Sequence, residues 1–319
     1  MSSSKAQSPS TVSILINNYN YAQFLDESIQ SALNQTYEPC EIIIVDDGSQ
    51  DTSVAVIEQY LPNINALMKE NAGQASAFNA GFFLCTGDII CFLDADDYFY
   101  SEKISEIVRI FSKNPDIGWI FHPLEYVTAQ GTPLNKSNAS DITQSKNIDF
   151  RIKLKLGISP KESIPCGLCF RRSTLEKILP MPESIGVSIS DNYLKYAAIG
   201  LSPGLLLDKK LAVQRIHSSN TYTFRQDNHL LRAEIHIKTG YYLQEQFPEF
   251  GLFADKLFVK GVAEMLSMFS FKKLWNIEEV SKHIIRNLYP HFVMLNFLKC
   301  VFHIFKFSYL RLQHQMIGN

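Results

Sequence analysis

The chain has 319 residues, enough for one large α/β domain and an extension. Hydrophobic residues make up 46% of it and charged residues 19%, as is ordinary for a globular protein. A net charge of −2 gives no support for a nucleic-acid partner, whose usual footprint on a protein is a basic patch. Residues 1–10 are rich in serine and have no apolar core, so we expect a disordered tail rather than a signal peptide or membrane anchor.

Short apolar segments with the length and composition of strands dominate the first third of the chain. They alternate with helical patterns, and this alternation is typical of a parallel βαβ sheet. Several of them end in polar residues, and ligands of such sheets bind beyond the carboxyl ends of the strands. Strands are predicted at 12–16, 41–46, 64–68, 88–93 and 117–121, and helices at 22–34, 51–60, 74–85 and 101–113.

The rest of the chain falls into a mixed part and a helical part. Residues 128–148 form the longest polar stretch and predict a long loop. After about residue 225 the pattern becomes helical. The predicted elements are a strand at 164–171, helices at 174–179 and 190–199, one or two strands within 204–216, and helices at 228–246, 252–270, 277–288 and 292–313.

Three carboxylates, Asp94, Asp96 and Asp97, follow the predicted strand at 88–93. Carboxylates crowded at the end of a strand repel one another, so they must be solvated, capped or bound to a cation. A divalent ion held by one or two of them, with phosphate oxygens completing its shell, is one solution. The alternative is a strand-to-helix turn in which Asp97 or Ser101 caps the next helix.

Six cysteines show no spacing typical of a disulfide framework. Cys166 and Cys169 form a CxxC, but a tetrahedral zinc site needs a second pair, and the segment has the composition of a buried strand. The sequons at Asn34, Asn135 and Asn138 carry little weight without an export signal. We therefore expect the reducing cytoplasm as the compartment.

Five motifs occur in the order and spacing found in the family 2 glycosyltransferases, and the chain resembles that family densely from about residue 11 to 100. The resemblance implies an α/β enzyme of the GT-A fold, with a mainly parallel nucleotide-binding sheet flanked by helices. We expect a nucleotide-binding half at 11–122, an acceptor half at 123–225 and a helical region at 226–319. The motifs are VSILINNYN (12–20), SALNQTY (31–37), IIIVDDGS (42–49), NAGQASAFNAG (71–81) and GDIICFLDADD (87–97).

The resemblance also assigns a metal site. Asp96 matches the metal ligand of the family's DxD motif, and Asp94 is expected nearer the ribose or the ion. His217 resembles a histidine that closes over the donor and completes the coordination. The implied cofactor is Mn²⁺ or Mg²⁺, which would stabilise the charge that builds up on the diphosphate leaving group.

Four further residues are implied in nucleotide-sugar binding. Asp47 matches an aspartate that accepts a hydrogen bond from the base, typically from uracil N3–H, and Tyr19 is expected to stack on that base. Asn17 occupies a position that often carries Thr or Pro. Many relatives carry Arg just before the position of Asn79, near the diphosphate, but this chain has Phe78 there, so neutralisation is expected to depend more on the metal.

Asp191 matches the family's catalytic base, and Ser190 stands where relatives usually carry Glu. The alternative is that Asp191 only caps the helix that it precedes. Arg215 has two open interpretations, pairing with the diphosphate or holding Asp191. Arg171 and Arg172 in turn are expected either to meet a phosphate on the acceptor or to be solvated at the surface.

The predicted function is an inverting, metal-dependent transfer of one sugar from a nucleotide sugar to a hydroxyl of a glycan or lipid-linked acceptor. The resemblance favours a UDP-sugar as the donor. The Gln-x-x-Arg-Trp motif of processive synthases is absent, which favours one transfer per encounter. The alternative is a catalytically silent nucleotide-sugar binding module. A basic amphipathic helix at 292–313 indicates peripheral membrane contact at the inner face or self-association.

Overall fold

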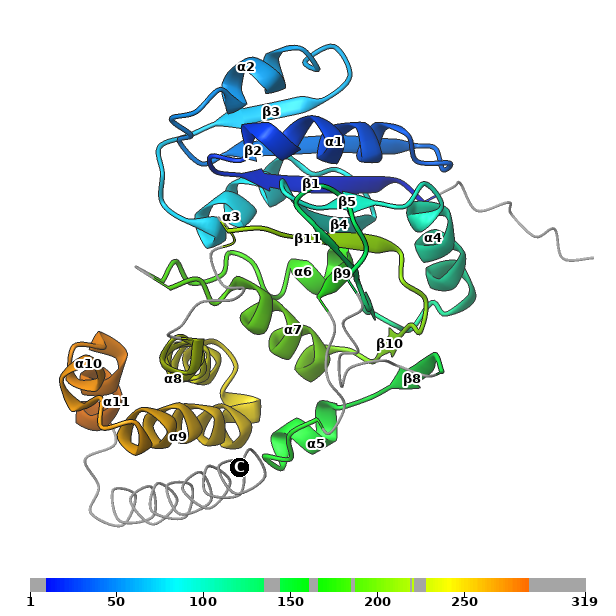
Figure 1. The fold of residues 1–319 in the computed structure, drawn as a ribbon. Coiled ribbons are helices and arrows are strands. Elements are labelled where there is room, and N and C mark those ends of the chain that lie inside the picture. The colour runs from blue at the N-terminus through cyan, green and yellow to red at the C-terminus, as the bar shows by residue number, and fades with distance from the viewer. Residues whose placement is uncertain are drawn as a thin grey trace, which may run out of the picture. The chain divides into compact units, whose positions relative to one another are not determined.

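The computed structural model describes residues 10–134, 144–160, 166–184, 187–218, 220 and 228–286. An eight-stranded sheet runs through its N-terminal part, in the order β3-β2-β1-β4-β9-β6-β10-β8 (Figure 1). β1 pairs in parallel with β2 and with β4, whereas β9 is antiparallel to β4 and β6. The strands are β1 Val12–Asn18, β2 Cys40–Asp46, β3 Asn65–Met68, β4 Ile89–Asp94, β6 Trp119–His122, β8 Lys146–Ile148, β9 Gly167–Arg171 and β10 Gly204–Leu206.

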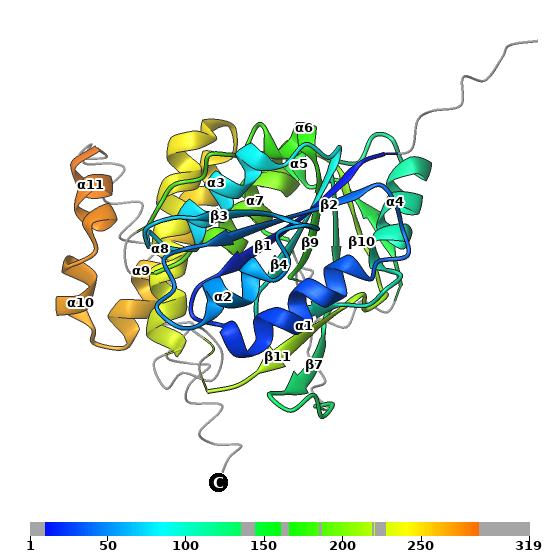
Figure 2. The same ribbon diagram turned by 90° about the horizontal axis from the view of Figure 1, so that it is seen from above.

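Helices cover both faces of this sheet (Figure 2). α1 (Ala22–Leu33), α2 (Ser53–Glu58) and α4 (Lys103–Lys113) pack on the face that carries Ile14 and Ile16. α3 (Gln74–Leu84) packs on the opposite face, where a Cβ at Gly81 would lie 2.3 Å from Leu15 Cδ1. The backbone at Gly81 therefore approaches the sheet so closely that no larger residue fits between helix and sheet.

A small second sheet, in the order β5-β11-β7, was not predicted from the sequence. Its strands are β5 (Tyr98–Phe99), β11 (Ala212–Ile216) and β7 (Glu125–Thr128), and Val213 of β11 lies opposite Tyr98 of β5. β5 has only two residues, too few for the alternation of apolar and polar side chains that identifies a strand in a sequence. The consequence is functional, because this pairing brings residues near 215 beside the carboxylates after β4.

The chain divides into two compact units. The first comprises 1–151, 161–183 and 194–217, and the second comprises 152–160, 184–193 and 218–319. The predicted domain boundaries remain a prediction. The remaining helices are α5 Arg151–Lys155, α6 Arg172–Leu175, α7 Ser190–Leu201, α8 Asn228–Gln246, a 3₁₀ turn at Pro248–Phe250, α9 Gly251–Ser267, α10 Phe271–Trp275 and α11 Glu278–Arg286.

The expected helical region is confirmed in its described part. α8 and α9 approach closely because Gly240 and Gly261 lie between them, and a Cβ at Gly261 would meet the carbonyl oxygen of Ala233 at 2.4 Å. The predicted helix at 292–313 and the predicted tail at 1–10, apart from residue 10, lie outside the described residues. Within the described part of the chain, no helix is both long enough and apolar enough to cross a membrane.

Arg171 and Arg172 are half-buried and bond to backbone carbonyl groups, so neither is simply solvated at the surface. Arg171 donates from Nη2 to the carbonyl of Phe111 at 2.8 Å, near the end of α4. Arg172 donates from Nε to Gly87 O at 2.8 Å and from Nη2 to Cys85 O at 2.6 Å, just beyond α3. Both guanidiniums therefore bond to backbone carbonyl groups at or just beyond the carboxyl end of a helix, where a cation is also favoured by the helix dipole.

The second cysteine of the CxxC segment lies in a buried strand, as the sequence predicted. Cys169 is buried in β9 and lies opposite Cys91 of β4 in the antiparallel register. Cys166 is exposed, with its Sγ 3.6 Å from Lys195 Nζ. All cysteines of the described residues are free thiols, and Cys300 lies outside them.

Candidate functional site

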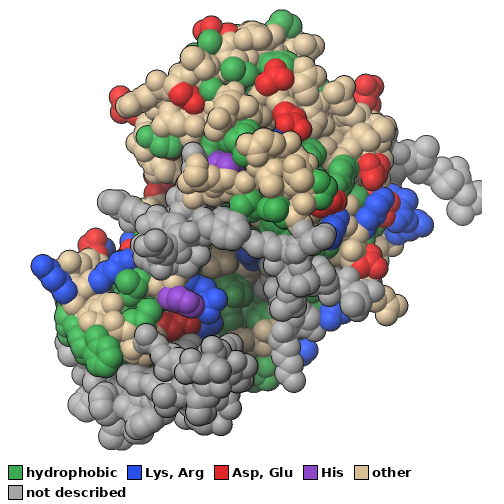
Figure 3. Space-filling view, in the orientation of Figure 1, with side chains coloured by type: hydrophobic (Ala, Val, Ile, Leu, Met, Phe, Trp, Pro, Cys, Tyr) green, Lys and Arg blue, Asp and Glu red, His purple; other side chains and the backbone are tan. Residues whose placement is uncertain are grey.

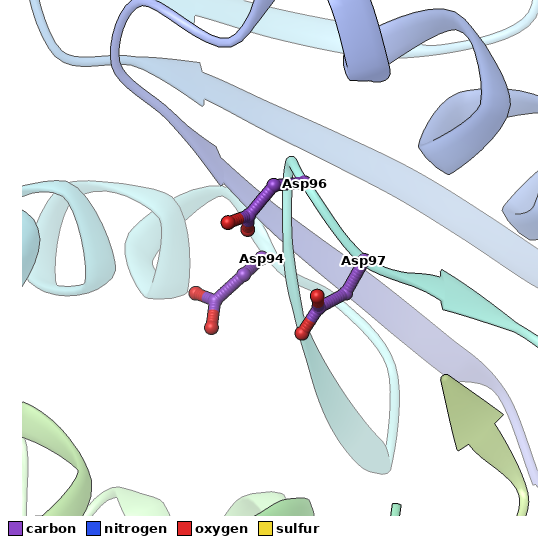
Figure 4. Close-up of side chains that lie close together, drawn as sticks. All are labelled: Asp94, Asp96 and Asp97. Carbon is purple, nitrogen blue, oxygen red and sulfur yellow. The ribbon is translucent and has the colours of Figure 1, made fainter. Parts of the chain in front are cut away.

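The carboxylates of Asp94, Asp96 and Asp97 lie together at the carboxyl end of β4 (Figure 4). Their nearest oxygens are all within 4.8 Å of one another. β4 lies beside β1 in the sheet. From β1 the chain first adds β2 and β3 on one side, and it then crosses to the other side of β1 to form β4. Such a reversal of strand order leaves a crevice beyond the strands, which is where α/β sheets bind ligands.

Asp97 anchors this turn to the second sheet. Its Oδ1 accepts a hydrogen bond from the backbone N–H of Arg215 at 2.9 Å. Burial raises the pKa of Asp97 well above its usual value, and the neighbouring Asp96 and Asp94 raise it further. α4 begins only at Lys103, with Glu102 at its N-cap and no side-chain cap hydrogen bond. The alternative that Asp97 or Ser101 caps this helix is therefore wrong.

Arg215 bonds to the carboxylate turn itself, a contact that neither interpretation from the sequence included. Its guanidinium is buried, and it donates from Nε to the carbonyl of Asp96 at 3.1 Å and from Nη1 to Ala129 O at 3.2 Å. Its Nη2 pairs with Glu27 Oε2 of α1 at 2.5 Å. The side chain thus holds the backbone of the carboxylate turn in place, and the sequence missed Glu27 because α1 lies 188 residues away from Arg215.

His217 reaches the site by the same strand. Its Nε2 lies 3.1 Å from Asp96 Oδ2, so the structure brings together the two residues predicted as metal ligands. The imidazole is buried and packs between Phe24, at 4.6 Å between ring centroids, and Tyr21, at 5.6 Å. This packing fixes the ring with one nitrogen directed at the carboxylate cluster.

Gln74, to which the sequence assigned no role, contacts the cluster from the other side. Its Nε2 donates to Asp94 Oδ1 at 3.1 Å. Gln74 is the first residue of α3, and Gly73 before it has a φ of +90°, a conformation that favours glycine. The start of α3, which has no side-chain cap hydrogen bond, is therefore directed toward Asp94. The sequence does contain a signal for this role, because Gln74 directly follows Asn71-Ala72-Gly73 in the motif at 71–81.

Asp47 is buried and accepts three hydrogen bonds from the segment after β3. Its Oδ1 accepts from Lys69 Nζ at 2.6 Å and from the N–H of Ala72 at 3.1 Å, and its Oδ2 accepts from the N–H of Gly73 at 2.7 Å. Asp47 therefore shapes the segment that leads into α3. A contact with the base would be an additional hydrogen bond to an oxygen that already has a donor.

We expect Asp47→Ala to weaken a uridine nucleotide by about 1–3 kcal/mol, the usual cost of leaving a buried donor without its partner. Titration calorimetry with UDP measures this loss. Guanosine diphosphate is the control, because its base presents a different edge. Equal losses for both nucleotides would show that Asp47 acts only through the three donors that it holds, and not on the base.

Hydrogen bonds between side chains at the ends of β1 and β2 connect the turns that follow these two strands. Asp46 accepts from Asn18 Nδ2 at 2.7 Å and from the N–H of Ser49 at 2.9 Å, and so orients the turn after β2. Asn17 Oδ1 is buried and has no hydrogen-bond partner among the described residues. Tyr19, two residues later in the chain, is exposed, with its ring available for stacking. A buried acceptor that lacks a partner among the described residues and an exposed ring thus lie two residues apart at the end of β1.

Asn79 has a positioning role in the structure rather than an open side chain. Its Nδ2 donates to Met181 O at 2.8 Å, and its Oδ1 accepts from the N–H of Met181 at 2.8 Å. The side chain is buried, so a direct contact with a nucleotide sugar would have to replace these bonds. Phe78 is buried against Phe92, with ring centroids 4.6 Å apart, which explains why an arginine could not stand there.

Asp191 lies in the second unit, in the first turn of α7. The helix already includes Ser190, so Asp191 is not its N-cap, and that alternative is wrong. Ser190 is buried, and its hydroxyl lies 2.9 Å from that of Ser188. Asp191 itself is partly exposed. Its role as a base remains a prediction.

Comparisons with known proteins agree with this arrangement. An uncharacterised glycosyltransferase of Nostoc sp. strain PCC 7120 is 35% identical over 224 residues, covering 66% of each chain. One of Rickettsia prowazekii is 42% identical over 108 residues, which are 33% of this chain and 34% of that protein. The match therefore spans just under two thirds of the first relative and about a third of the second.

The fold has a counterpart among solved structures. The crystal structure of S. aureus TarS 1–349 in complex with UDP-GlcNAc superimposes with a TM-score of 0.58 at 17% identity, covering 81% of this chain and 73% of that one. At this identity the likeness concerns the fold, which is that of the GT-A glycosyltransferases. The sequence profile of "Glycosyl transferase family 2" matches residues 13–179, more than half of the chain. The chain belongs to glycosyl transferase family 2.

Proposed function

We propose that this protein is an inverting, metal-dependent, non-processive glycosyltransferase that moves one sugar from a UDP-sugar to a hydroxyl of a glycan or lipid-linked acceptor. The observation that carries the proposal is the group of Asp94, Asp96 and Asp97, with His217 Nε2 3.1 Å from Asp96. Three carboxylates held this close are unfavourable without a cation, because like charges and burial both oppose ionisation.

The donor set fits a divalent cation. Carboxylate oxygens suit Mg²⁺ and Mn²⁺, and an imidazole is a common ligand of transition metals. Asp96 and His217 would hold the ion, with Asp94 beside it. Bound there, the ion would stabilise the negative charge that develops on the diphosphate as the sugar leaves. Arg215 and Asp97 keep the carboxylate turn in position for it.

The N-terminus of α3 supplies a second favourable environment for the diphosphate. The first backbone N–H groups of a helix have no partner within the helix, and together with the helix dipole they favour anions. Gln74 directs this end of α3 toward Asp94. We propose that these groups take over part of the role of the arginine that Phe78 replaces.

The base of the nucleotide is assigned to the end of β1 and the turn after β2. We propose that Tyr19 stacks on it, while Asn17 and Asp47 contact its edge. Asn17 Oδ1, buried and lacking a hydrogen-bond partner within the described part of the chain, supports a donor from outside the protein. TarS, which shares the fold, was solved with UDP-GlcNAc, and this favours uridine over other nucleotides for the present chain.

Asp191 is our candidate for the base that removes the proton from the acceptor hydroxyl. A single displacement inverts the anomeric centre and needs one base and no protein nucleophile. The predicted compartment is the cytoplasm, with peripheral contact to the inner face of the membrane for a lipid-linked acceptor. The competing function is a binding module that holds the nucleotide sugar and does not turn it over, because Ser190 stands in place of a glutamate.

A donor screen separates these two functions. Thermal shift with a panel of UDP- and GDP-sugars, each with Mn²⁺, Mg²⁺ or EDTA, identifies the donor, since a ligand at 100 times its dissociation constant adds about 2.7 kcal/mol to stability. Release of the nucleoside diphosphate is then followed with the donor that binds. Metal-dependent release supports the transferase. Metal-dependent binding with no release over hours, with or without candidate acceptors, would instead identify the binding module.

A further inference from the structure

The turn between α9 and α10 exposes large aromatic side chains to solvent. Phe269 is 82% exposed, Phe271 50% and Trp275 65%, and Lys272 beside them is exposed as well. We call these four residues the aromatic tip. Leu274, between them in sequence, is buried against α8 and α9 and anchors the tip to the second unit.

Phe269 is costly to the fold in two ways. It is the most exposed of the large hydrophobic side chains in the described part of the chain. Its φ is also +52°, a left-handed conformation in which a bulky residue is strained. The N–H groups of Phe269 and Ser270 donate to Leu266 O at 3.0 Å and Met265 O at 3.1 Å, closing α9 in the way that glycine usually does. Glycine would serve the fold better here, so the phenylalanine has another use.

The charge around the tip is mainly basic. Figure 3 shows hydrophobic and basic side chains next to one another over the α10 region, at the left of the view. Lys273 lies 3.4 Å from Glu234, and the nearby Glu278 is paired with Lys282 at 2.7 Å. From residue 268 to the end, the sequence contains seven Lys or Arg and two Asp or Glu. The net positive charge of this stretch of sequence complements an anionic surface.

We propose that the aromatic tip docks on an anionic lipid bilayer by inserting Phe269, Phe271 and Trp275 into its interface. Phe and Trp with adjacent Lys is the composition that favours the boundary between headgroups and acyl chains. Residues that protrude from a helix turn suit a deformable surface, whereas a protein partner would need a matching pocket. The inference does not depend on the transferase activity, but it would place the enzyme beside lipid-linked acceptors.

Vesicle co-sedimentation of the full chain tests this, with vesicles of phosphatidylcholine alone or with 30% phosphatidylglycerol at low and at physiological salt. We expect binding to the anionic vesicles only, weakened by salt. Phe269→Gly and Trp275→Ser should each reduce partitioning by about tenfold, since each removes one large apolar side chain from the interface. Phe83→Ser is the matched control, because Phe83 is 76% exposed on α3 and should leave binding unchanged.

Phe269→Gly also distinguishes docking from a structural role. Glycine is unstrained at positive φ, so this variant should keep or raise the melting temperature of the protein while it loses vesicle binding. A clear fall in melting temperature would show that Phe269 supports the fold and would overturn the inference.

Tryptophan fluorescence gives an independent measurement. The chain has two tryptophans, and Trp119 is fully buried, so quenching by brominated lipid reports on Trp275. We expect quenching on binding to anionic vesicles. Vesicle binding without quenching, or with the Phe269→Gly and Trp275→Ser variants unimpaired, would assign docking to another part of the chain. Loss of a dimer in these variants, with no vesicle binding by the parent protein, would identify the tip as a contact between two copies instead.

Discussion

Asp96→Ala is expected to abolish the metal-dependent binding of a nucleoside diphosphate. Asp96 is buried at the end of β4, and it is the carboxylate that His217 Nε2 approaches at 3.1 Å. Its removal leaves the imidazole without its partner and Asp94 as the nearest ligand. Loss of residues that merely orient ligands typically costs 10–100-fold in metal affinity, so loss of a ligand should cost at least about 100-fold. Calorimetry with UDP and Mn²⁺ measures it.

The same variant should not be less stable without metal. Three carboxylates within 4.8 Å repel one another: burial raises the pKa of Asp97, and the neighbouring Asp96 and Asp94 raise it further. Removing one charge relieves this repulsion, so the metal-free melting temperature should stay the same or rise. Asp116→Ala is the control, because Asp116 is exposed in the loop after α4 and its loss changes net charge equally. Unchanged Mn²⁺-dependent binding by Asp96→Ala would remove Asp96 from the metal site.

The strands and the carboxylate cluster could be predicted because their signals are local. An apolar run ending in polar residues identifies a strand and its carboxyl end, and neighbouring parallel strands bring such ends together. Asp94, Asp96 and His217 were therefore chosen correctly as neighbours, with His217 supplied by the family resemblance. The structure adds that β11 brings His217 beside Asp96. The pairing of β11 with β5 that does this has no signature in either short segment.

Other roles could not be predicted because they depend on backbone groups that a sequence does not place. Arg171 and Arg172 bond to carbonyls at helix ends, and Asn79 bonds to both backbone polar groups of Met181, 102 residues later. Arg215 bonds to the carbonyl of Asp96, 119 residues before it. In each case residue type correctly indicated a polar contact, but the partners include backbone groups far away in the sequence.

Asp191→Asn is expected to lower donor turnover by at least about 100-fold, because a positioned base contributes ~10²–10⁴-fold and an amide has no basicity. Release of nucleoside diphosphate, with water or an acceptor present, is the measurement. Binding of the donor should be unchanged, since the residues that we propose for the metal and for the nucleotide base lie in the first unit.

The structure makes this a sharp test of whether Asp191 is a base or a structural residue. Asp191 is in the first turn of α7, so its structural contribution is the attraction of a carboxylate to the helix N-terminus, worth about 0.3–1 kcal/mol. Asparagine loses only this attraction to the helix N-terminus, so the melting temperature of the protein should hardly change. Asn192→Ala, one residue along the same turn, is the control and should retain full turnover. A hundredfold loss confined to Asp191→Asn, with intact stability and donor affinity, leaves proton removal as the explanation. If Asp191→Asn keeps more than a tenth of the parent turnover, the base lies elsewhere and Asp191 serves only the helix.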